Sequence, residues 1–121
     1  MTVEPGRRDR VEGDQMGWLL LVLAGVFEIG FTTSMRYIDW SLRPGPIVTF
    51  LVCSIASFAL LIASMRSIPL GTAYAVWTGI GAAGTALLGI LYYGEVATTV
   101  RIMLLLVLIG SIIGLKLVAP D

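Results

Sequence analysis

Glu28 is the residue with the clearest chemical potential, because it is an acidic side chain inside a long apolar run. The run from Trp18 to Met35 has the length of a bilayer-spanning helix and holds no other charged residue. An ionised carboxylate at that depth costs on the order of several kcal/mol unless it faces water, a cation or a proton. The placement therefore predicts a site for a cation or a proton. A protonated carboxyl that joins two helices by a hydrogen bond is the alternative.

The composition favours a membrane protein and disfavours an enzyme. Hydrophobic residues make up 57% of the 121 residues and charged residues 13%, against about a quarter in ordinary soluble proteins. The formal net charge is zero, which gives no indication of a nucleic-acid partner. There is no histidine, and Glu28 is the one acidic residue within the apolar runs. Neither a metal site, a cofactor site nor a nucleophile–base pair is predicted.

Four apolar segments predict an all-α membrane protein with four transmembrane helices. The segments are about 17–36, 46–66, 70–93 and 101–119, and each is long enough to cross a bilayer. The short connections between them predict antiparallel neighbours within one domain, residues 16–121. Residues 1–15 hold seven of the sixteen charged residues and no apolar periodicity, so a disordered N-terminal tail is expected.

Polar-tipped side chains on the second and third segments are candidates for the substrate site. Tyr74 and Trp77 are three residues apart and share one face of a helix. Trp77 is interpreted as a binding residue, because its ring attracts cations and its N–H can bond a carboxylate. For Tyr74, anchoring at the membrane interface remains open. Ser54 and Ser57 also share a face, and either hydroxyl could orient Glu28, although backbone bonding is favoured for Ser54.

Two glycine patterns suggest positions of movement and of contact. Gly79 and Gly81 lie within one helical turn, which suits either a hinge or close packing. Gly110 and Gly114 form a GxxxG spacing in the fourth segment, which is typical of helix–helix dimerisation.

The distribution of basic residues barely specifies an orientation in the membrane. Without residues 1–15, Arg66 and Lys116 lie on one side and three arginines, at 36, 43 and 101, on the other. Counting Arg7, Arg8 and Arg10 changes two against three to five against three and favours a cytoplasmic N-terminus. Four helices are also too few to enclose a midplane site. We therefore expect an antiparallel dimer with inverted-repeat symmetry.

These residues resemble the small multidrug resistance family of proton-coupled exporters, over Met16 to about Val118. The matching motifs are AGVFEIGF (24–31), IPLGTAYAVWTGIG (68–81) and IGLKL (113–117). The resemblance implies a multi-pass protein of the bacterial inner membrane that needs no cofactor and uses a proton gradient. The TGIG after Trp77 looks like the branch that exports guanidinium or small guanidinyl compounds.

The resemblance also assigns roles to individual residues. Glu28 matches the family's shared carboxylate, and Tyr74 and Trp77 match its binding-site aromatics. Ser57 matches a serine that hydrogen-bonds the glutamate, and Gly25 matches a small residue beside the site. In the implied mechanism, two antiparallel subunits bring their carboxylates into one pocket, where protons and a small cation compete.

Two positions depart from the guanidinium-exporter pattern. Phe31 stands where that branch usually has tryptophan, and Arg36 where it usually has lysine. A similar loss of the indole occurs in family members that work as pairs of two different subunits. Both a homodimer and a heterodimer therefore remain open. A pump for quaternary ammonium compounds is the alternative function.

Overall fold

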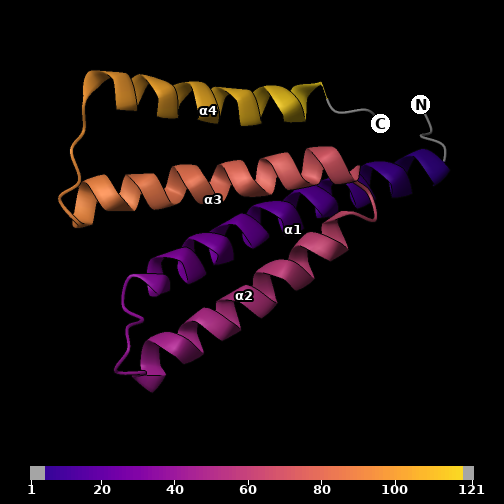
Figure 1. Ribbon diagram of the computed structural model, residues 1–121. Helices are drawn as coiled ribbons and strands as arrows, with labels where there is room; N and C mark the ends of the chain where they lie inside the picture. Colours follow the sequence, from indigo (N-terminus) through magenta and orange to yellow (C-terminus); the bar gives the residue numbers. More distant parts are fainter. Residues whose placement is uncertain (1–4, 119–121) are drawn as a thin grey trace.

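The computed structural model describes residues 5–118 and contains four α-helices, with no strand in that range (Figure 1). The helices are α1 Pro5–Met35, α2 Pro44–Ser64, α3 Leu70–Tyr92 and α4 Thr99–Leu117. The all-helical fold with four spans is therefore confirmed.

All four helices have the length and composition to cross a membrane, but they are not equally apolar. Mean hydropathy is 2.4 for α2 and 2.3 for α4, against 1.7 for the spanning part of α1 and 1.5 for α3. The difference arises because α1 carries Glu28 and α3 carries a run of glycines, threonines and alanines. The two less apolar helices are thus the ones that hold most of the candidate site.

The first helix begins much earlier than expected. The sequence predicts a helix from about residue 17, whereas α1 already begins at Pro5 and includes residues 5–15. Proline suits the first turn of a helix, and the Glu, Arg and Gln residues that follow have good helix propensity. An apolar helix that is already nucleated extends into such a segment at little cost. Residues 1–4 lie outside the described range.

The other helix boundaries differ from prediction by about two residues. Helix α2 begins at Pro44 rather than 46, with proline in its first turn. Helix α4 begins at Thr99 because the Thr98 side chain accepts a hydrogen bond from the Arg101 backbone N–H at 3.1 Å. Helix α4 ends at Leu117, two residues before the predicted end at 119.

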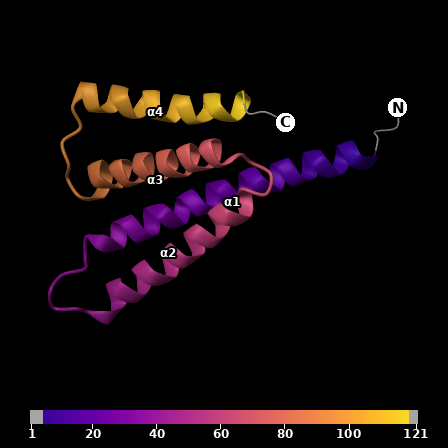
Figure 2. The ribbon, with the colours of Figure 1, turned by 45° about the vertical axis from the view of Figure 1, so that its right-hand side comes forward.

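Helix α1 is the centre of the arrangement, and α4 is its least attached member. Helix α1 packs along both α2 and α3, while α2 and α3 approach each other little. Helix α4 packs against α3 alone (Figures 1 and 2). It contributes no buried residue. The chain is therefore a packed unit of three helices with a fourth on its outer side.

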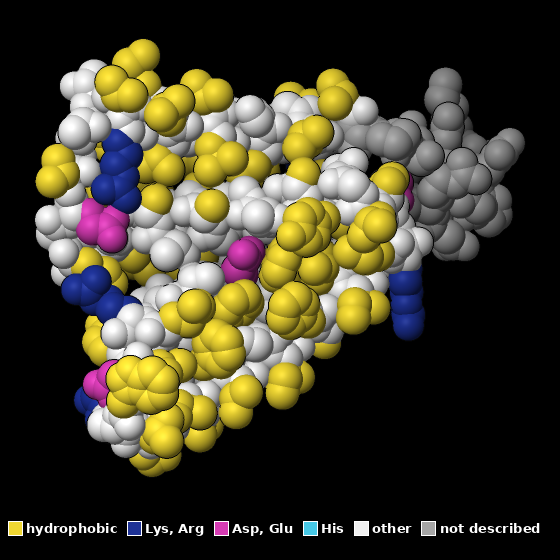
Figure 3. All heavy atoms as spheres, viewed as in Figure 1, with side chains coloured by type: hydrophobic (Ala, Val, Ile, Leu, Met, Phe, Trp, Pro, Cys, Tyr) yellow, Lys and Arg dark blue, Asp and Glu magenta, His cyan; other side chains and the backbone are white. Residues whose placement is uncertain are grey.

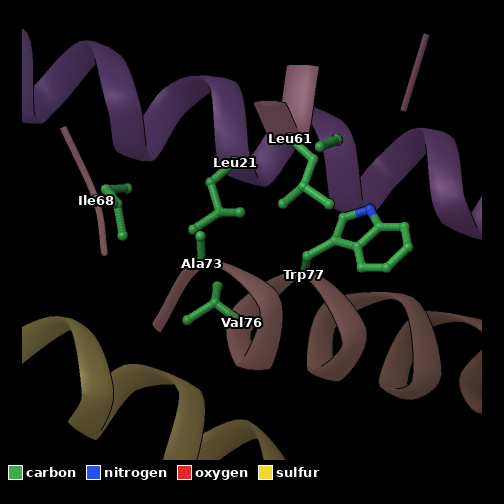
Figure 4. Packing of buried hydrophobic residues seen from close by; sticks show 7 residues of the cluster. Leu21, Leu61, Ile68, Ala73, Val76 and Trp77 are labelled. Atoms are coloured by element: carbon green, nitrogen blue, oxygen red, sulfur yellow. The ribbon is translucent and has the colours of Figure 1, made fainter. Parts of the chain in front are cut away.

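The buried core lies where α1, the end of α2 and the start of α3 meet. Figure 4 shows its apolar side chains converging from these segments. The members are Leu21, Ala24, Leu61, Ile68, Ala73, Val76 and Trp77. Trp77 is 6% exposed even though it is the largest of them. The core thus fixes the indole in place next to the middle of α1.

An aromatic and basic contact joins the residues that directly follow α1 and α3, at the end opposite the core. The Tyr37 and Tyr93 hydroxyls are 2.7 Å apart, and the Arg36 guanidinium lies 4.1 Å from the centre of the Tyr93 ring. This hydrogen bond raises the pKa of Tyr93 above its usual value. In the view of Figure 3, hydrophobic side chains are spread along the whole molecule among other uncharged groups. Charged groups lie near its ends, with one acidic side chain at mid-length.

Close contact between α1 and α3 depends on Gly25. A Cβ atom at this position would lie 2.8 Å from the Cβ of Ile80, an atom fixed to its backbone. We expect Gly25→Ala to lower the free energy of unfolding by about 1–3 kcal/mol through overpacking. Gly71→Ala is the control, since that position has no atom within 4 Å. Thermal unfolding in detergent compares the two, and equal melting temperatures would contradict the packing described here.

Candidate functional site

Glu28 lies in the middle of α1 with its carboxylate against α3. The side chain is only 9% exposed, and its Oε2 atom has no hydrogen-bond partner within residues 5–118. The carboxylate contacts the backbone at Gly81, where an added Cβ would come within 2.7 Å of the Glu28 Cγ. A glycine at position 81 is therefore what lets the acidic side chain fit between the helices.

Glu28 borders a cleft of about 400 Å³ between α1 and α3. The lining residues are Glu28, Thr32, Thr78, Gly81, Ala82, Thr85, Ala86, Glu95 and Arg101. The hydroxyls of Thr32 and Thr85 are hydrogen-bonded to each other at 2.7 Å and join α1 to α3 at the border of the cleft. The one basic residue in this lining, Arg101, is paired with Glu95 at 2.7 Å. The carboxylate of Glu28 thus faces hydroxyl groups and small side chains.

Ser57 connects three helices through one hydroxyl group. The Trp77 Nε1–H of α3 donates to Ser57 Oγ at 2.9 Å, and Ser57 of α2 donates to the Ala24 carbonyl of α1 at 2.7 Å. Ser57 is fully buried. Because its single proton is directed at Ala24, Ser57 does not donate to Glu28 in this structure. The expected serine–glutamate bond is replaced by one to the backbone, four residues before Glu28.

The aromatic side chains form a continuous row beside this junction. Ring centroids are 5.7 Å apart for Tyr74 and Trp77, 5.4 Å for Trp77 and Phe58, and 6.2 Å for Phe58 and Phe31. Phe50 completes the row at 5.8 Å from Phe31. Tyr74, at 55% exposure, is the accessible end of this row. Phe31 is held by stacking and offers no hydrogen-bond donor to Glu28.

The glycines that suggest a hinge lie in closely packed positions. Helix α3 continues without interruption through residues 79–81. Gly79 faces α4, where a Cβ would lie 2.7 Å from Ile112 Cδ1, and Gly81 faces Glu28. Both glycines therefore have a packing role in this conformation, and the hinge remains a prediction.

The glycines of α4 face open space. Gly110 and Gly114 have no atom within 4 Å of an added Cβ. In the described part of this single chain, their surface has no neighbour, so their role in dimer contact stays a prediction.

Sequence reasoning missed the polar lining of the cleft. Thr32, Thr85, Glu95 and Arg101 all border it, yet none was a candidate. A signal was present on α3, where Thr78 and the residues after it repeat a polar or small side chain every three or four positions. That spacing places them on one face of the helix.

Comparison with known proteins identifies the family. The family model described as Small Multidrug Resistance protein matches residues 16–109. The chain belongs to the small multidrug resistance family. It is 48% identical over 102 residues to the guanidinium exporter of Yersinia pseudotuberculosis, covering 84% of this chain and 98% of the relative. It is 45% identical over 102 residues to the guanidinium exporter of Escherichia coli K12, covering 84% and 97%.

Membership of the small multidrug resistance family confirms the resemblance, and the match includes the motifs at 24–31 and 68–81. Together with the four apolar helices, it makes the chain a multi-pass membrane protein of a transporter family. The match begins at Met16, within α1, and ends at residue 109, within α4, so it includes all of α2 and α3.

The hydrogen bond between Trp77 and Ser57 is open to a direct test. We expect a double-mutant cycle of Trp77→Phe and Ser57→Ala to give a coupling of about 0.5–1 kcal/mol, because the indole donor is left unpaired when the hydroxyl is removed. Stability is measured by denaturation in detergent. Trp18→Phe combined with Ser57→Ala is the control and should be additive. Additivity in both cycles would show that the bond contributes nothing.

Proposed function

We propose that this protein exports guanidinium or small guanidinyl compounds in exchange for protons, and works as an antiparallel dimer. The family and the relatives named guanidinium exporter support export of a small cation. In the proposal, Glu28 binds either a proton or the cation and never both. The proton gradient supplies the energy, and no cofactor takes part.

The observation that carries the proposal is the state of Glu28. It is an isolated carboxylate, nine-tenths buried, with one oxygen unpartnered among the described residues. Burial of such a group is costly unless a cation or proton neutralises it. Because the neutralising species can be exchanged, a single group can couple proton entry to cation exit.

Guanidinium suits this site by shape and by hydrogen bonding. It is planar, carries one positive charge and directs several N–H donors outward, so it pairs with carboxylates through two parallel hydrogen bonds. Trp77 and Tyr74 do not border the cleft of the single chain. In the proposal, they stack against the cation in the pocket that the dimer forms, and Gly25 allows the close approach of α1 and α3 beside it. Ser57 holds the indole of Trp77 in position for this task.

The exposed surface of α4 supports the proposed dimer. Helix α4 buries no side chain, and Gly110 and Gly114 present an open surface for close helix contact. In the proposal, a second copy inserted in the opposite sense packs on this surface. Its own Glu28 completes the pocket. Gly79 and Gly81 then bend α3 as the pocket opens to one side or the other.

A pair of unlike subunits is the alternative assembly, and Phe31 favours it. Its ring stacks on Phe58, meets Phe50 edge to face and supplies no donor to the carboxylate. In the proposal, a related partner chain contributes the missing indole N–H to Glu28.

Exchange should depend on Glu28 above all other residues. In proteoliposomes, we expect Glu28→Gln to abolish proton movement driven by guanidinium, because glutamine can release no proton. In the wild type, the affinity for guanidinium should rise by up to about tenfold for each unit by which the pH is raised, where one proton competes with the cation. Asp39→Asn, which removes a carboxylate outside the cleft, is the control and should leave both transport and detergent-solubilised dimers intact. Wild-type transport by Glu28→Gln would refute the mechanism, and preference for tetraphenylphosphonium over guanidinium would favour a multidrug pump.

Phe31→Trp distinguishes the two assemblies. If the indole donor is what the chain lacks, we expect this variant, expressed alone, to transport guanidinium at least several-fold faster than wild type. Phe58→Trp, which changes the neighbouring ring in the same row, is the control. Labelling of both termini in cells reports orientation. Full activity of wild type alone with mixed orientation would rule out an obligatory unlike partner.

A further inference from the structure

A stripe of small and polar residues on α3 leads away from Glu28 toward the α3–α4 connection. Its members are Thr78, Gly81, Ala82, Thr85, Ala86 and Gly89, spaced so that they share one face of the helix. The first five line the cleft between α1 and α3. The stripe therefore forms the α3 side of the cleft, which begins at the buried carboxylate of Glu28.

A carboxylate lies over a glycine at each end of this stripe. Glu28 lies over Gly81, and Glu95 lies over Gly89, where an added Cβ would be 2.9 Å from Glu95 Oε1. Eight residues separate the two glycines, which corresponds to about 12 Å along the helix axis. The cleft thus connects an inner, buried carboxylate with an outer, accessible one.

The turn after α3 fixes the outer carboxylate in this position. Gly94 adopts a positive φ of 68°, a conformation that glycine accepts without strain. The chain then folds back, and the backbone N–H of Glu95 donates to the Gly89 carbonyl at 3.0 Å. The side chain of Glu95 is therefore directed over α3 and borders the cleft.

Glu95 already holds a guanidinium group, that of Arg101. The Arg101 Nη2 atom lies 2.7 Å from Glu95 Oε2, and the two side chains are 37% and 45% exposed. Ion pairs at this exposure are weak, because water competes with both partners. A free guanidinium ion offers the same donors and the same charge, so it can replace the Arg101 side chain at Glu95.

We propose that Glu95 is an outer binding residue for guanidinium, which exchanges there with Arg101 and then passes along the α1–α3 cleft to Glu28. This inference rests on the proposed function and extends it. The unpartnered oxygen of Glu28 marks the inner end of the path. Between the two carboxylates, the Thr32 and Thr85 hydroxyls are bonded to each other at 2.7 Å. As the cation passes, this bond opens and the two hydroxyls bond the cation in place of hydration water. In an antiparallel pair, one such path opens on each side of the membrane.

The test uses opposite effects of the two partners of the ion pair. In guanidinium-driven proteoliposome transport, Glu95→Gln should raise KM about two- to fivefold, and Arg101→Gln should lower KM by a similar factor, because the built-in competitor is gone. The maximal rate should change little in either variant. A purely structural ion pair would make both variants worse in the same direction, which would overturn the proposal.

Variants elsewhere at the same end of the molecule control for surface charge. Asp39 and Arg43 lie in the connection between α1 and α2 and do not border the cleft. Hydrogen bonds from Ser41 hold the pKa of Asp39 below its usual range, so it is fully charged at neutral pH. Asp39→Asn and Arg43→Gln should leave KM unchanged. Shifts equal to those of Glu95→Gln and Arg101→Gln would reduce the effect to surface potential and overturn the proposal.

A bulky residue in the cleft tests the path itself. Ala86 lies between the levels of the two carboxylates, and Ala86→Phe should slow transport at least tenfold while guanidinium still binds at equilibrium. Leu91→Phe adds bulk to an exposed position outside the cleft lining and should have no effect. Unchanged transport by Ala86→Phe would overturn the path. Wild-type protein and Glu28→Gln are measured alongside. If the wild type itself does not transport guanidinium, the proposed function fails, and not only the path along the cleft.

Discussion

The three helices that form the site depend on the hydroxyl group of Ser57. Helices α2 and α3 hardly touch each other, yet the Trp77 indole reaches across to Ser57, which in turn bonds the Ala24 carbonyl. All of these groups are buried, so each polar atom needs its partner within the protein. The bond to Ala24 lies one turn before Glu28 on α1. The rotation of α1, and with it the direction of the carboxylate, is thereby linked to the position of the indole.

Helix α3 makes contacts through three different faces: with the apolar core, with α4 and with Glu28 of α1. Ala73, Val76 and Trp77 pack into the core, Gly79 faces Ile112 of α4, and the stripe from Gly81 faces Glu28 and the cleft. Glycine is required where another chain segment must approach the backbone closely. A single helix can therefore hold the carboxylate on one side and the aromatic core on another, which separates the charged part of the site from its apolar support.

The placement of Glu28 and the four spans could be predicted from sequence, because an acidic residue inside an apolar run is informative without any knowledge of packing. The partners of Ser57 could not. Spacing along one helix says which residues share a face, but not how neighbouring helices are rotated against each other. The outer carboxylate Glu95 was missed for a related reason. It lies in a connection, and its position over Gly89 depends on the backbone conformation of Gly94.

The order of hydropathy along the chain bears on how the protein enters the membrane. The polar site lowers the mean hydropathy of α1 and α3 to 1.7 and 1.5, and each is followed by a helix of 2.4 or 2.3. Short connections join these helices into two hairpins, each with a site-bearing and a strongly apolar member. Insertion of a hairpin as one unit lets the apolar member carry the other across the bilayer. When each hairpin inserts as one unit, the apolar excess of α2 and α4 offsets the polarity that α1 and α3 need for their chemistry.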